Sequence, residues 1–567
     1  MNQIDWIILI SSLVFIIVYG VYKGRGNKDL HGYLMADNNI RWYVVALSVM
    51  ATQASAITFL STPGQAYTDG MRFVQFYLGL PLAMIVLSVT VIPIYHRLKV
   101  YTAYEYLENR FDLKTRGLAA VLFLMQRSLA AGLTIYAPAI ILSTLLGWNI
   151  YWTNTILGVM VIIYTASGGS KAVSFTQMHQ MIIILFAMVG AFFMILYLLP
   201  KGVSFTDALF VAGKMGKLNA IDFTFDLTNR YNIWSGVIGG FFLSLSYFGT
   251  DQSQVQRYLT GKSITHSRLG LLTNGMVKVP MQFFILLLGA LVFVFYQFSA
   301  PPLFFNSVVG QEIRDSHLGV KYKAVEKEYE TASHAKSDLI RKMVQTRHQG
   351  DDTSLAVVEQ QVDAAEKRVT ALKGEGVALI KQHTAGKETG DTNYIFLFFI
   401  LKYMPVGLLG LVIAAIIAAS MSSTSSELNS LASASVIDIY KRMMKKDGSD
   451  HHYLVVSKLL TVAWGGFAIL FAQFANRLGT LVEAVNILGS LVYGTILGIF
   501  LVAFYVKSVR GAAAFYAAIL AEIGVLLVSV LTDITYLWYN VVGCFLVIGL
   551  SIVINWMLQF KKKPLVA

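Results

Sequence analysis

The amino-acid sequence predicts an all-helical protein that crosses a membrane many times. Of its 567 residues, 56% are hydrophobic and only 14% are charged, a balance outside the range of ordinary soluble domains. Apolar runs of about 20 residues recur along the chain, and each is long enough to cross a bilayer as a helix. The strands of a membrane barrel would alternate apolar and polar residues instead. The composition therefore excludes a barrel, a disordered chain and a coiled coil.

The formal charge of +13 raises the question of a nucleic-acid partner. In a protein with many membrane spans, however, an excess of Lys and Arg normally marks the cytoplasmic loops. We therefore expect the lipid bilayer of the cell (inner) membrane as the partner and no nucleic acid. The single cysteine, Cys544, excludes an intrachain disulfide and a cysteine-based metal site.

About thirteen spans are expected from the positions of the apolar runs. They lie near 5–21, 42–66, 72–96, 116–146, 150–166, 175–199, 232–256, 267–298, 405–436, 453–475, 478–505, 511–531 and 537–559. Asp5 precedes the first run where a signal peptide would carry basic residues, so we expect a retained first helix and an N-terminus outside. Alternation then puts the C-terminus and all the basic clusters inside, as the positive-inside rule requires. These clusters are 96–99, 114–116, 257–268, 441–446, 507–510 and 561–563.

Residues 306–392 break this pattern, because they are polar and rich in helix-forming residues. The alternation of spans places this insertion outside. The spacing of Val358, Val362, Ala365, Val369 and Leu372 predicts an amphipathic helix, paired with 320–345 as a hairpin. The simplest interpretation is a solvated spacer. The alternative is a lid, or a docking element for an extracytoplasmic partner.

Two polar stretches interrupt apolar spans. Residues 51–64 contain a Pro-Gly pair among Ser, Thr and Gln, and membrane helices tolerate such a stretch only where the freed backbone lines a cavity. Unwound main-chain carbonyls can replace water around a small cation, and a second helix can add hydroxyls. The Ser-rich stretch 418–429 supplies such hydroxyls, although small residues there also suit plain helix packing. Together the two stretches predict a cation site.

Several ordered motifs make a family resemblance specific. They are Gly32-Tyr-Leu-Met-Ala36, Tyr101-Thr-Ala-Tyr-Glu-Tyr-Leu-Glu-Asn-Arg-Phe111, Gly168-Gly-Ser-Lys-Ala-Val173, Gln252-Ser-Gln-Val-Gln-Arg257 and Asp438-Ile-Tyr-Lys441. Together they resemble the sodium/solute symporter family, with a pattern similar to its bacterial sugar and sialic acid carriers. The resemblance implies a LeuT-type fold of two inverted five-helix repeats, over 42–199 and 232–505. Residues 1–41 then form an extra N-terminal helix and loop, and 506–567 form two C-terminal helices and a basic tail.

The resemblance also implies that Na⁺ is the coupling ion. Its ligands would be the carbonyls of Ala51, Ala54 and Ala419 and the hydroxyls of Ser422 and Ser423. Some family members have a second sodium site that includes an Asp, and Gln177 stands at that place here. Ser425 and Ser426 still match the second site. Because the carboxylate is missing, we expect one Na⁺ per cycle.

The substrate pocket is inferred from the same resemblance. Lys278, Tyr247 and Asn486 stand where the sugar carriers have pocket residues, and Ser55 and Thr58 resemble pocket residues of the sialic acid carriers. Tyr77 and Ser244 replace polar residues of the sugar carriers. Gln53 and Gln75 are further candidates, because their amides would be costly in lipid. A structural alternative pairs Lys278 with an acid such as Glu483. Arg127 lies about one helical turn from the place of the carboxylate-binding Arg of sialic acid carriers, and we expect it to snorkel to the cytoplasmic interface.

The function expected from these residues is sodium-coupled import of a small polar organic solute. A sugar or sugar derivative suits the hydroxyl, amide and aromatic side chains best. The alternatives are a sialic acid, a polyol or a small carboxylate as substrate, or a transporter-derived sensor without flux. The sequence has no phosphate-cradling Gly loop, nucleophile elbow or metal-spaced His/Cys cluster, so we expect no enzyme activity.

Overall fold

A computed structural model describes residues 1–24, 29–386, 390–475 and 480–560, and within them the regular structure is helical. Ten helical segments there are long and apolar enough to span a membrane, and three shorter apolar helices, Trp42–Gln53, Ile150–Ile163 and Ser235–Gly249, accompany them. The predicted all-helical class and the count of about thirteen spans are confirmed. The predicted basic cluster 561–563 lies outside the described residues.

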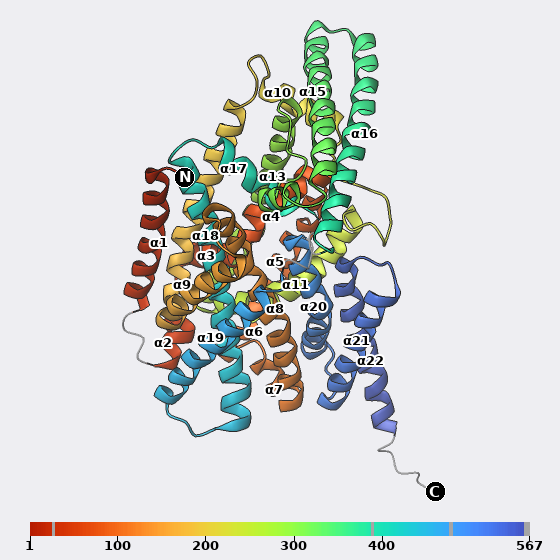
Figure 1. Ribbon diagram of the computed structural model, residues 1–567. Coiled ribbons are helices and arrows are strands. Elements are labelled where there is room, and N and C mark those ends of the chain that lie inside the picture. The colour runs from red at the N-terminus through yellow and green to blue at the C-terminus, as the bar shows by residue number, and fades with distance from the viewer. Residues whose placement is uncertain (25–28, 387–389, 476–479, 561–567) are drawn as a thin grey trace.

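The core helices follow the predicted spans closely (Figure 1). They are α1 (Gln3–Gly24), α3 (Trp42–Gln53), α4 (Ala56–Asp69), α5 (Leu80–Val89), α6 (Val91–Leu98), α8 (Leu113–Leu146), α9 (Ile150–Tyr197), α11 (Gly240–Gly249), α12 (Gln252–Leu259), α13 (Ile264–Phe298), α18 (Leu408–Ala434), α19 (Asp450–Ala472), α20 (Leu481–Tyr505), α21 (Gly511–Leu531) and α22 (Tyr536–Phe560). The predicted spans 150–166 and 175–199 form the single element α9, which kinks at Gly169 (φ 62°, ψ −174°). Glycine adopts this backbone readily because it has no Cβ.

The predicted interruption of the first core helix is present. Helix α3 ends at Gln53 and α4 begins at Ala56, with Ala54 in a non-helical conformation and Ser55 extended. Pro63 lies inside α4 without ending it. A Cβ on Gly64 would lie 2.0 Å from the carbonyl oxygen of Thr392, so only glycine lets the segment at 392 approach α4 this closely. The helix that begins there, α17 (Thr392–Tyr403), packs against α4.

The Ser-rich helix α18 lies in the middle of the bundle. It packs against α1, α8, α9 and α19, and most of its side chains are buried. The outer helices expose large apolar side chains instead, such as Phe186, Leu459 and Val530. In a membrane these side chains face lipid. The polar residues of α18 are therefore shielded from lipid by a full layer of helices.

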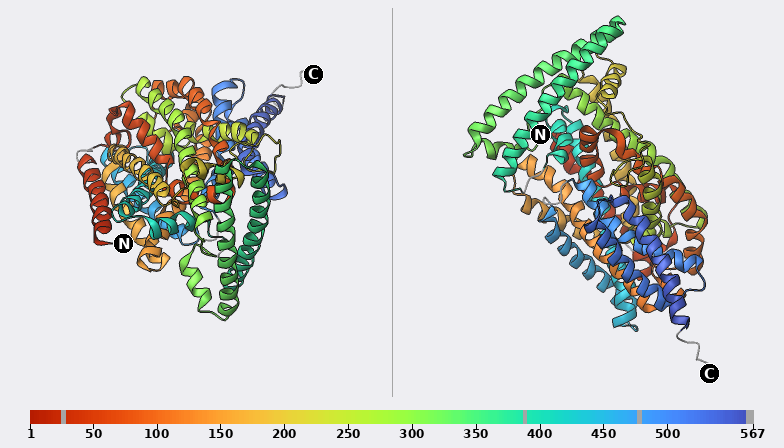
Figure 2. Two further views of the ribbon diagram at one scale, coloured as in Figure 1. Left: turned by 90° about the horizontal axis from the view of Figure 1, so that it is seen from above. Right: turned by 90° about the vertical axis from the view of Figure 1, so that its right-hand side faces the viewer.

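The insertion forms the predicted hairpin, α15 (Gly319–Gln349) and α16 (Asp352–His383). It lies at the same end of the bundle as the start of α1, opposite the last turns of α22 (Figures 1 and 2). Tyr322, Tyr329 and Leu372 belong to an apolar cluster inside it, shared with the preceding α14 (Ser307–Arg314). The hairpin is also docked on the bundle, because Arg347 and His348 contact Asp207 of α10 (Phe205–Lys214) at 3.1 and 2.9 Å.

Candidate functional site

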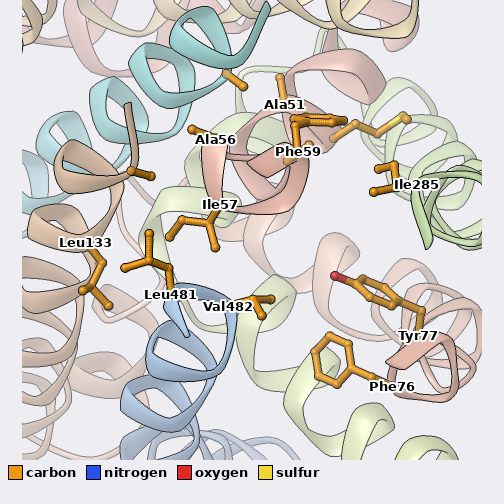
Figure 3. Packing of buried hydrophobic residues seen from close by; sticks show 14 of the residues in the cluster. Ala51, Ala56, Ile57, Phe59, Phe76, Tyr77, Leu133, Ile285, Leu481 and Val482 are labelled. Carbon is orange, nitrogen blue, oxygen red and sulfur yellow. The ribbon is translucent and has the colours of Figure 1, made fainter. Parts of the chain in front are cut away.

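The break between α3 and α4 faces the serine row of α18. The hydroxyls of Ser422 and Ser423 both donate to the carbonyl oxygen of Ala51, at 3.1 and 3.3 Å. Ala51, Ala54 and Ala419 are completely buried. Figure 3 shows Ala51 and Ala56, which flank the break. The fold thus brings the two polar stretches together, although their residues lie about 370 positions apart in sequence.

This arrangement offers neutral oxygens to a small cation. A hydroxyl that donates to a carbonyl can rotate and offer its lone pairs, so Ser422, Ser423 and Ala51 can all act as ligands. Hard cations of this kind take oxygen ligands, including backbone carbonyls freed by unwinding. The donor set therefore fits a Na⁺ ion.

Gln177 occupies a different setting from a cation ligand. Its Oε1 accepts a hydrogen bond from Ser48 (2.5 Å), and its Nε2 donates to Thr52 Oγ1 and to the carbonyl of Ser422, both at 3.0 Å. The amide N–H groups of Gln177 therefore bond to two oxygens, Thr52 Oγ1 and the Ser422 carbonyl, that could otherwise coordinate a second ion. The other predicted ligands of that ion are also engaged, because Ser425 donates to the Ser422 carbonyl (2.9 Å) and Ser426 to the Ser253 carbonyl (3.3 Å).

A cavity of about 90 Å³ adjoins the Ser423 hydroxyl. Of the residues predicted for the substrate, Gln53, Ser55, Thr58, Tyr77, Tyr247 and Asn486 line it. Polar residues that were not predicted for the substrate also line it: Thr52, Gln126, Arg127, Thr134, Ser423, Glu427 and Tyr493. The volume is far below the roughly 300 Å³ at the lower end of small-molecule sites, so the walls must move apart for a substrate to enter.

The prediction that Arg127 snorkels to the interface is wrong. Its side chain is only 4% exposed and is held between two carboxylates, Glu427 Oε1 at 3.1 Å and Asp251 Oδ2. Tyr493 donates to the same Asp251 oxygen at 2.8 Å, and Thr134 donates to Glu427 Oε2 at 2.8 Å. Buried acids in apolar spans normally have partners. Asp251 and Glu427 were therefore a signal that a buried cation lay nearby.

Lys278 and Ser244 are buried but do not line the cavity. The Lys278 ammonium lies 5.8 Å from the ring centre of Tyr77, which does line it. The alternative pairing of Lys278 with Glu483 is wrong, since Glu483 accepts from Arg230 at 2.6 Å. Lys278 Nζ has no hydrogen-bond partner among the residues that the structure describes.

Two amides have structural partners. Gln75, expected in the pocket, instead donates to the carbonyl of Tyr231 and accepts from the backbone of Asp222, both at 3.0 Å. That prediction is wrong, because a loop about 150 residues away in sequence satisfies the amide. Asn486 lines the cavity, but its Nδ2 donates to the Val482 carbonyl at 2.7 Å. It therefore has one N–H and its oxygen left for a ligand.

Comparison with known proteins identifies relatives over nearly the whole chain. The model of the sodium:solute symporter family matches residues 33–320 and 368–521, and the gap between them falls within the hairpin. The sodium/sialic acid symporter SiaT of Proteus mirabilis is 26% identical over 551 residues, which cover 95% of this chain and 92% of that protein. The sodium/sialic acid symporter NanT of Aliivibrio fischeri is 25% identical, over 96% of this chain and 92% of that protein.

A solved structure has the same fold. It is the substrate-bound, outward-open state of a Na⁺-coupled sialic acid symporter, with a TM-score of 0.75, 24% sequence identity and coverage of 98% of both chains. The likeness over the full length confirms the predicted fold class.

Proposed function

The chain belongs to the sodium:solute symporter family, and we propose that it imports one acidic sugar derivative together with one Na⁺. The family is one of transporters rather than enzymes, and sodium is its coupling ion. What remains to be proposed is where the ion binds, how many ions move, and which solute accompanies them.

We assign the ion to Ala51, Ala54, Ala419, Ser422 and Ser423. The support is the contact of both hydroxyls with the Ala51 carbonyl at the helix break. Because Ser423 also lines the substrate cavity, an ion held there can stabilise the cavity wall before the solute arrives. Coupling then follows from a residue shared between the two sites.

One Na⁺ per cycle follows from the environment of Gln177. Its amide donates to Thr52 and to the Ser422 carbonyl, so it supplies the hydrogen bonds that a second cation would otherwise satisfy. The hydrogen-bond partners of Gln177, Ser425 and Ser426 among the described residues are hydroxyls and backbone carbonyls, which carry no net charge. A second ion would enter this low-dielectric position without a neutralising charge, which is costly.

An acidic solute is supported by the four charged side chains in and next to the cavity, Arg127, Lys278, Asp251 and Glu427. Arg127 and Lys278 contribute two positive charges, and Asp251 and Glu427 contribute two negative charges. The bound Na⁺ then leaves one uncompensated positive charge, and a monoanionic solute restores neutrality. Lys278, whose Nζ has no hydrogen-bond partner among the described residues, is the cation we assign to a solute carboxylate. The relatives named as sialic acid symporters fit the same chemistry.

A neutral sugar or polyol is the second candidate. It is favoured by the ion pairs of Arg127 with Glu427 and Asp251, because a guanidinium that already contacts two carboxylates is poorly placed to bind a third. The cavity otherwise offers hydroxyls, amides and the rings of Tyr77 and Tyr247, which suit a sugar ring.

The charge moved per cycle separates these candidates. One Na⁺ with a monoanion is electroneutral, so a tenfold Na⁺ gradient supplies about 1.4 kcal/mol and accumulates the solute about tenfold. One Na⁺ with a neutral sugar moves one charge, and 100 mV then adds about 2.3 kcal/mol. We would measure uptake of labelled sialic acid and labelled glucose into proteoliposomes with and without an inside-negative potential. Potential-independent, Na⁺-dependent sialic acid uptake is expected, and stimulation of glucose uptake by the potential would select the neutral candidate.

The orientation of the chain in the membrane is proposed from the segments that lie at the two ends of the bundle. The hairpin and the start of α1 share one end, and the basic segment 441–446 lies near the other, so the hairpin faces outward by the positive-inside rule (Figure 1). An impermeant maleimide should label a G350C variant in intact cells, because Gly350 is the exposed turn between α15 and α16. Labelling only after lysis would reverse the orientation.

A further inference from the structure

A second cavity lies at the end of the bundle opposite the hairpin, away from the substrate site. Its volume is about 340 Å³. Three segments distant in sequence form its wall: α2 (Leu30–Met35) with the turn that follows, the end of α6 with Val100 and Tyr101, and the segment after α12. Its described lining residues are His31, Met35, Asn38, Tyr95, His96, Lys99, Val100, Tyr101, Leu259, Gly261 and Lys262.

The lining is basic. It carries two lysines and two histidines, and no Asp or Glu stands among the described residues that line it. Neither Lys99 nor Lys262 has a carboxylate within 4.0 Å in the part of the chain that the structure describes. His31 lies 3.9 Å from Asp37, whose side chain is 61% exposed. These lysines therefore keep their charge available for a ligand.

A neighbouring cluster shows how this fold treats basic side chains that it pairs internally. Arg116 contacts Glu108 and Asp438 at 2.7 Å each, and Arg442 contacts the same Glu108. Every guanidinium there has an acid from the protein. The contrast indicates that the charge around Lys99 and Lys262 is not simply part of an internal ion-pair network.

The backbone around the cavity is unusual as well. Among the described residues, five non-glycine residues have positive φ, and four of them, Ala36, Asp37, Asn38 and Lys99, lie in or beside this wall. Left-handed backbone is unfavourable for lysine and alanine, and such strain tends to persist at ligand-binding positions. Lys99 and Lys262 both line this cavity.

The wall is also fixed in place by bonds between its segments. Asn38 Nδ2 donates to the Leu259 carbonyl at 2.7 Å, and Ile40 exchanges backbone hydrogen bonds with the loop after α12, as donor to the Thr260 carbonyl (3.1 Å) and as acceptor from Lys262 (2.9 Å). A cavity held open in this way loses little entropy when a ligand enters.

We propose that this cavity binds a phosphate group. A phosphate carries up to two negative charges and several acceptor oxygens, which matches two lysines in a cavity that His31 and Tyr101 also line. The volume falls within the range of small-molecule sites. Exposed apolar side chains adjoin the lysines, Leu98 at 42% and Ile264 at 37%, so a lipid headgroup can supply the phosphate as well as a soluble ester.

The two sources are separated by two measurements on the full-length chain. Pyrophosphate is titrated calorimetrically into the protein in neutral detergent at constant ionic strength. Native mass spectrometry then counts the lipids retained from vesicles of phosphatidylcholine alone or with phosphatidylglycerol. Pyrophosphate binding alone identifies a soluble ester, and selective retention of phosphatidylglycerol identifies a lipid. If neither probe binds, the proposal is overturned.

The variants assign the binding to this cavity. K99Q/K262Q should weaken the interaction at least tenfold, because charged hydrogen bonds are lost. K445Q/K446Q removes the same charge from exposed residues of another loop and should leave binding unchanged. Equal loss in both variants would show a general charge effect and overturn the proposal.

A K99G variant distinguishes a ligand-binding lysine from a structural one. Glycine accepts the φ of 51° at this position without strain, so the ligand-free protein should melt at a higher temperature than the wild type. Binding of the same probe should still weaken at least tenfold. A variant that melts higher and binds equally well would contradict the proposal.

Discussion

Buried charge is handled differently in the bundle and in the α15–α16 hairpin. In the bundle, Arg127 and its partners Asp251 and Glu427 have side chains at most 5% exposed. In the hairpin, Lys336 is 4% exposed, but its partner Glu366, at 2.8 Å, is 36% exposed. A hairpin charge that loses its partner can turn toward water, whereas a bundle charge cannot. The same residue types therefore carry very different energetic weight in the two regions.

The largest expected difference comes from removing the central cation of each region. R127M leaves Asp251 and Glu427 buried without a cation, and breaking a buried pair in this way costs about 3–5 kcal/mol. K336M leaves Glu366, which is 36% exposed and can be solvated by water, so we expect a cost of only about 0.5–1 kcal/mol. We expect R127M to lose most of its folded protein and K336M to resemble the wild type, as measured by melting temperature in detergent and by the amount of monodisperse protein.

A double variant tests the reason for that loss. R127M/E427Q removes one of the two stranded charges and should recover part of the melting temperature. If R127M has the same melting temperature as the wild type, the ion pairs of Arg127 do not stabilise the fold. The proposed difference between the bundle and the hairpin would then be wrong.

The second prediction concerns Lys278, a buried bundle cation for which the described residues provide no hydrogen-bond partner. K278M replaces a buried ammonium by an apolar chain of similar length, so it should not lower the melting temperature. It should nevertheless raise the KM for an acidic sugar about ten- to a hundredfold, because a charged hydrogen bond contributes about 1.5–3 kcal/mol. Gln282, one turn further along α13, is also buried, and Q282M is the matched neutral control. An unchanged KM in K278M would remove this residue from substrate binding.

The third prediction separates ion binding from packing within α18. S423A removes one hydroxyl from the proposed Na⁺ site and should raise the Na⁺ concentration for half-maximal uptake up to about tenfold, since such a contact contributes about 0.5–1.5 kcal/mol. S430A is the control, because its hydroxyl donates to the Glu427 carbonyl within the same helix at 2.8 Å. Equal Na⁺ dependence in the two variants would reject the assignment of Ser423.

The smallest effect is expected where the hairpin docks on α10. Burial raises the pKa of Asp207, but hydrogen bonds from Ser204 and His348 outweigh it and hold the pKa below its usual value. A depressed pKa gives stability that is present above the unfolded pKa of about 3.9 and is lost as the pH falls through the lower folded value. The contribution of the Asp207 carboxylate to docking should therefore be lost only below about pH 4.

Hydrogen exchange at residues 340–349 measures this docking. D207N should lower the local protection by about 1 kcal/mol at neutral pH, because the carboxylate contacts with Arg347 and His348 are lost. D338N is the control, because Asp338 is exposed and lies on α15, the helix that carries Arg347 and His348. Protection that falls already between pH 7 and pH 5 in the wild type would show that another group controls the docking.

The sequence by itself determined the features that depend on local composition. Long apolar runs predict spans because a bilayer core has a fixed thickness, and the Pro-Gly and Ser/Thr content of 51–64 predicts a broken helix because free backbone groups are costly in lipid. The 3.6-residue spacing of Val358, Val362, Val369 and Leu372 predicts the hairpin helix for a similarly local reason. The family motifs then placed Ser422 and Ser423 opposite that break.

Only the tertiary structure decided which side chains meet. Arg127 finds Asp251 and Glu427, 124 and 300 residues away, and Gln75 is satisfied by a distant loop rather than by a ligand. The cavity at Lys99 and Lys262 likewise exists only because three separate segments converge. Helix propensity and hydrophobicity act over a few neighbouring residues, whereas the partner of a buried charge is set by how whole helices pack. That packing is why the same arginine was expected at a membrane surface and is found in the centre of the protein.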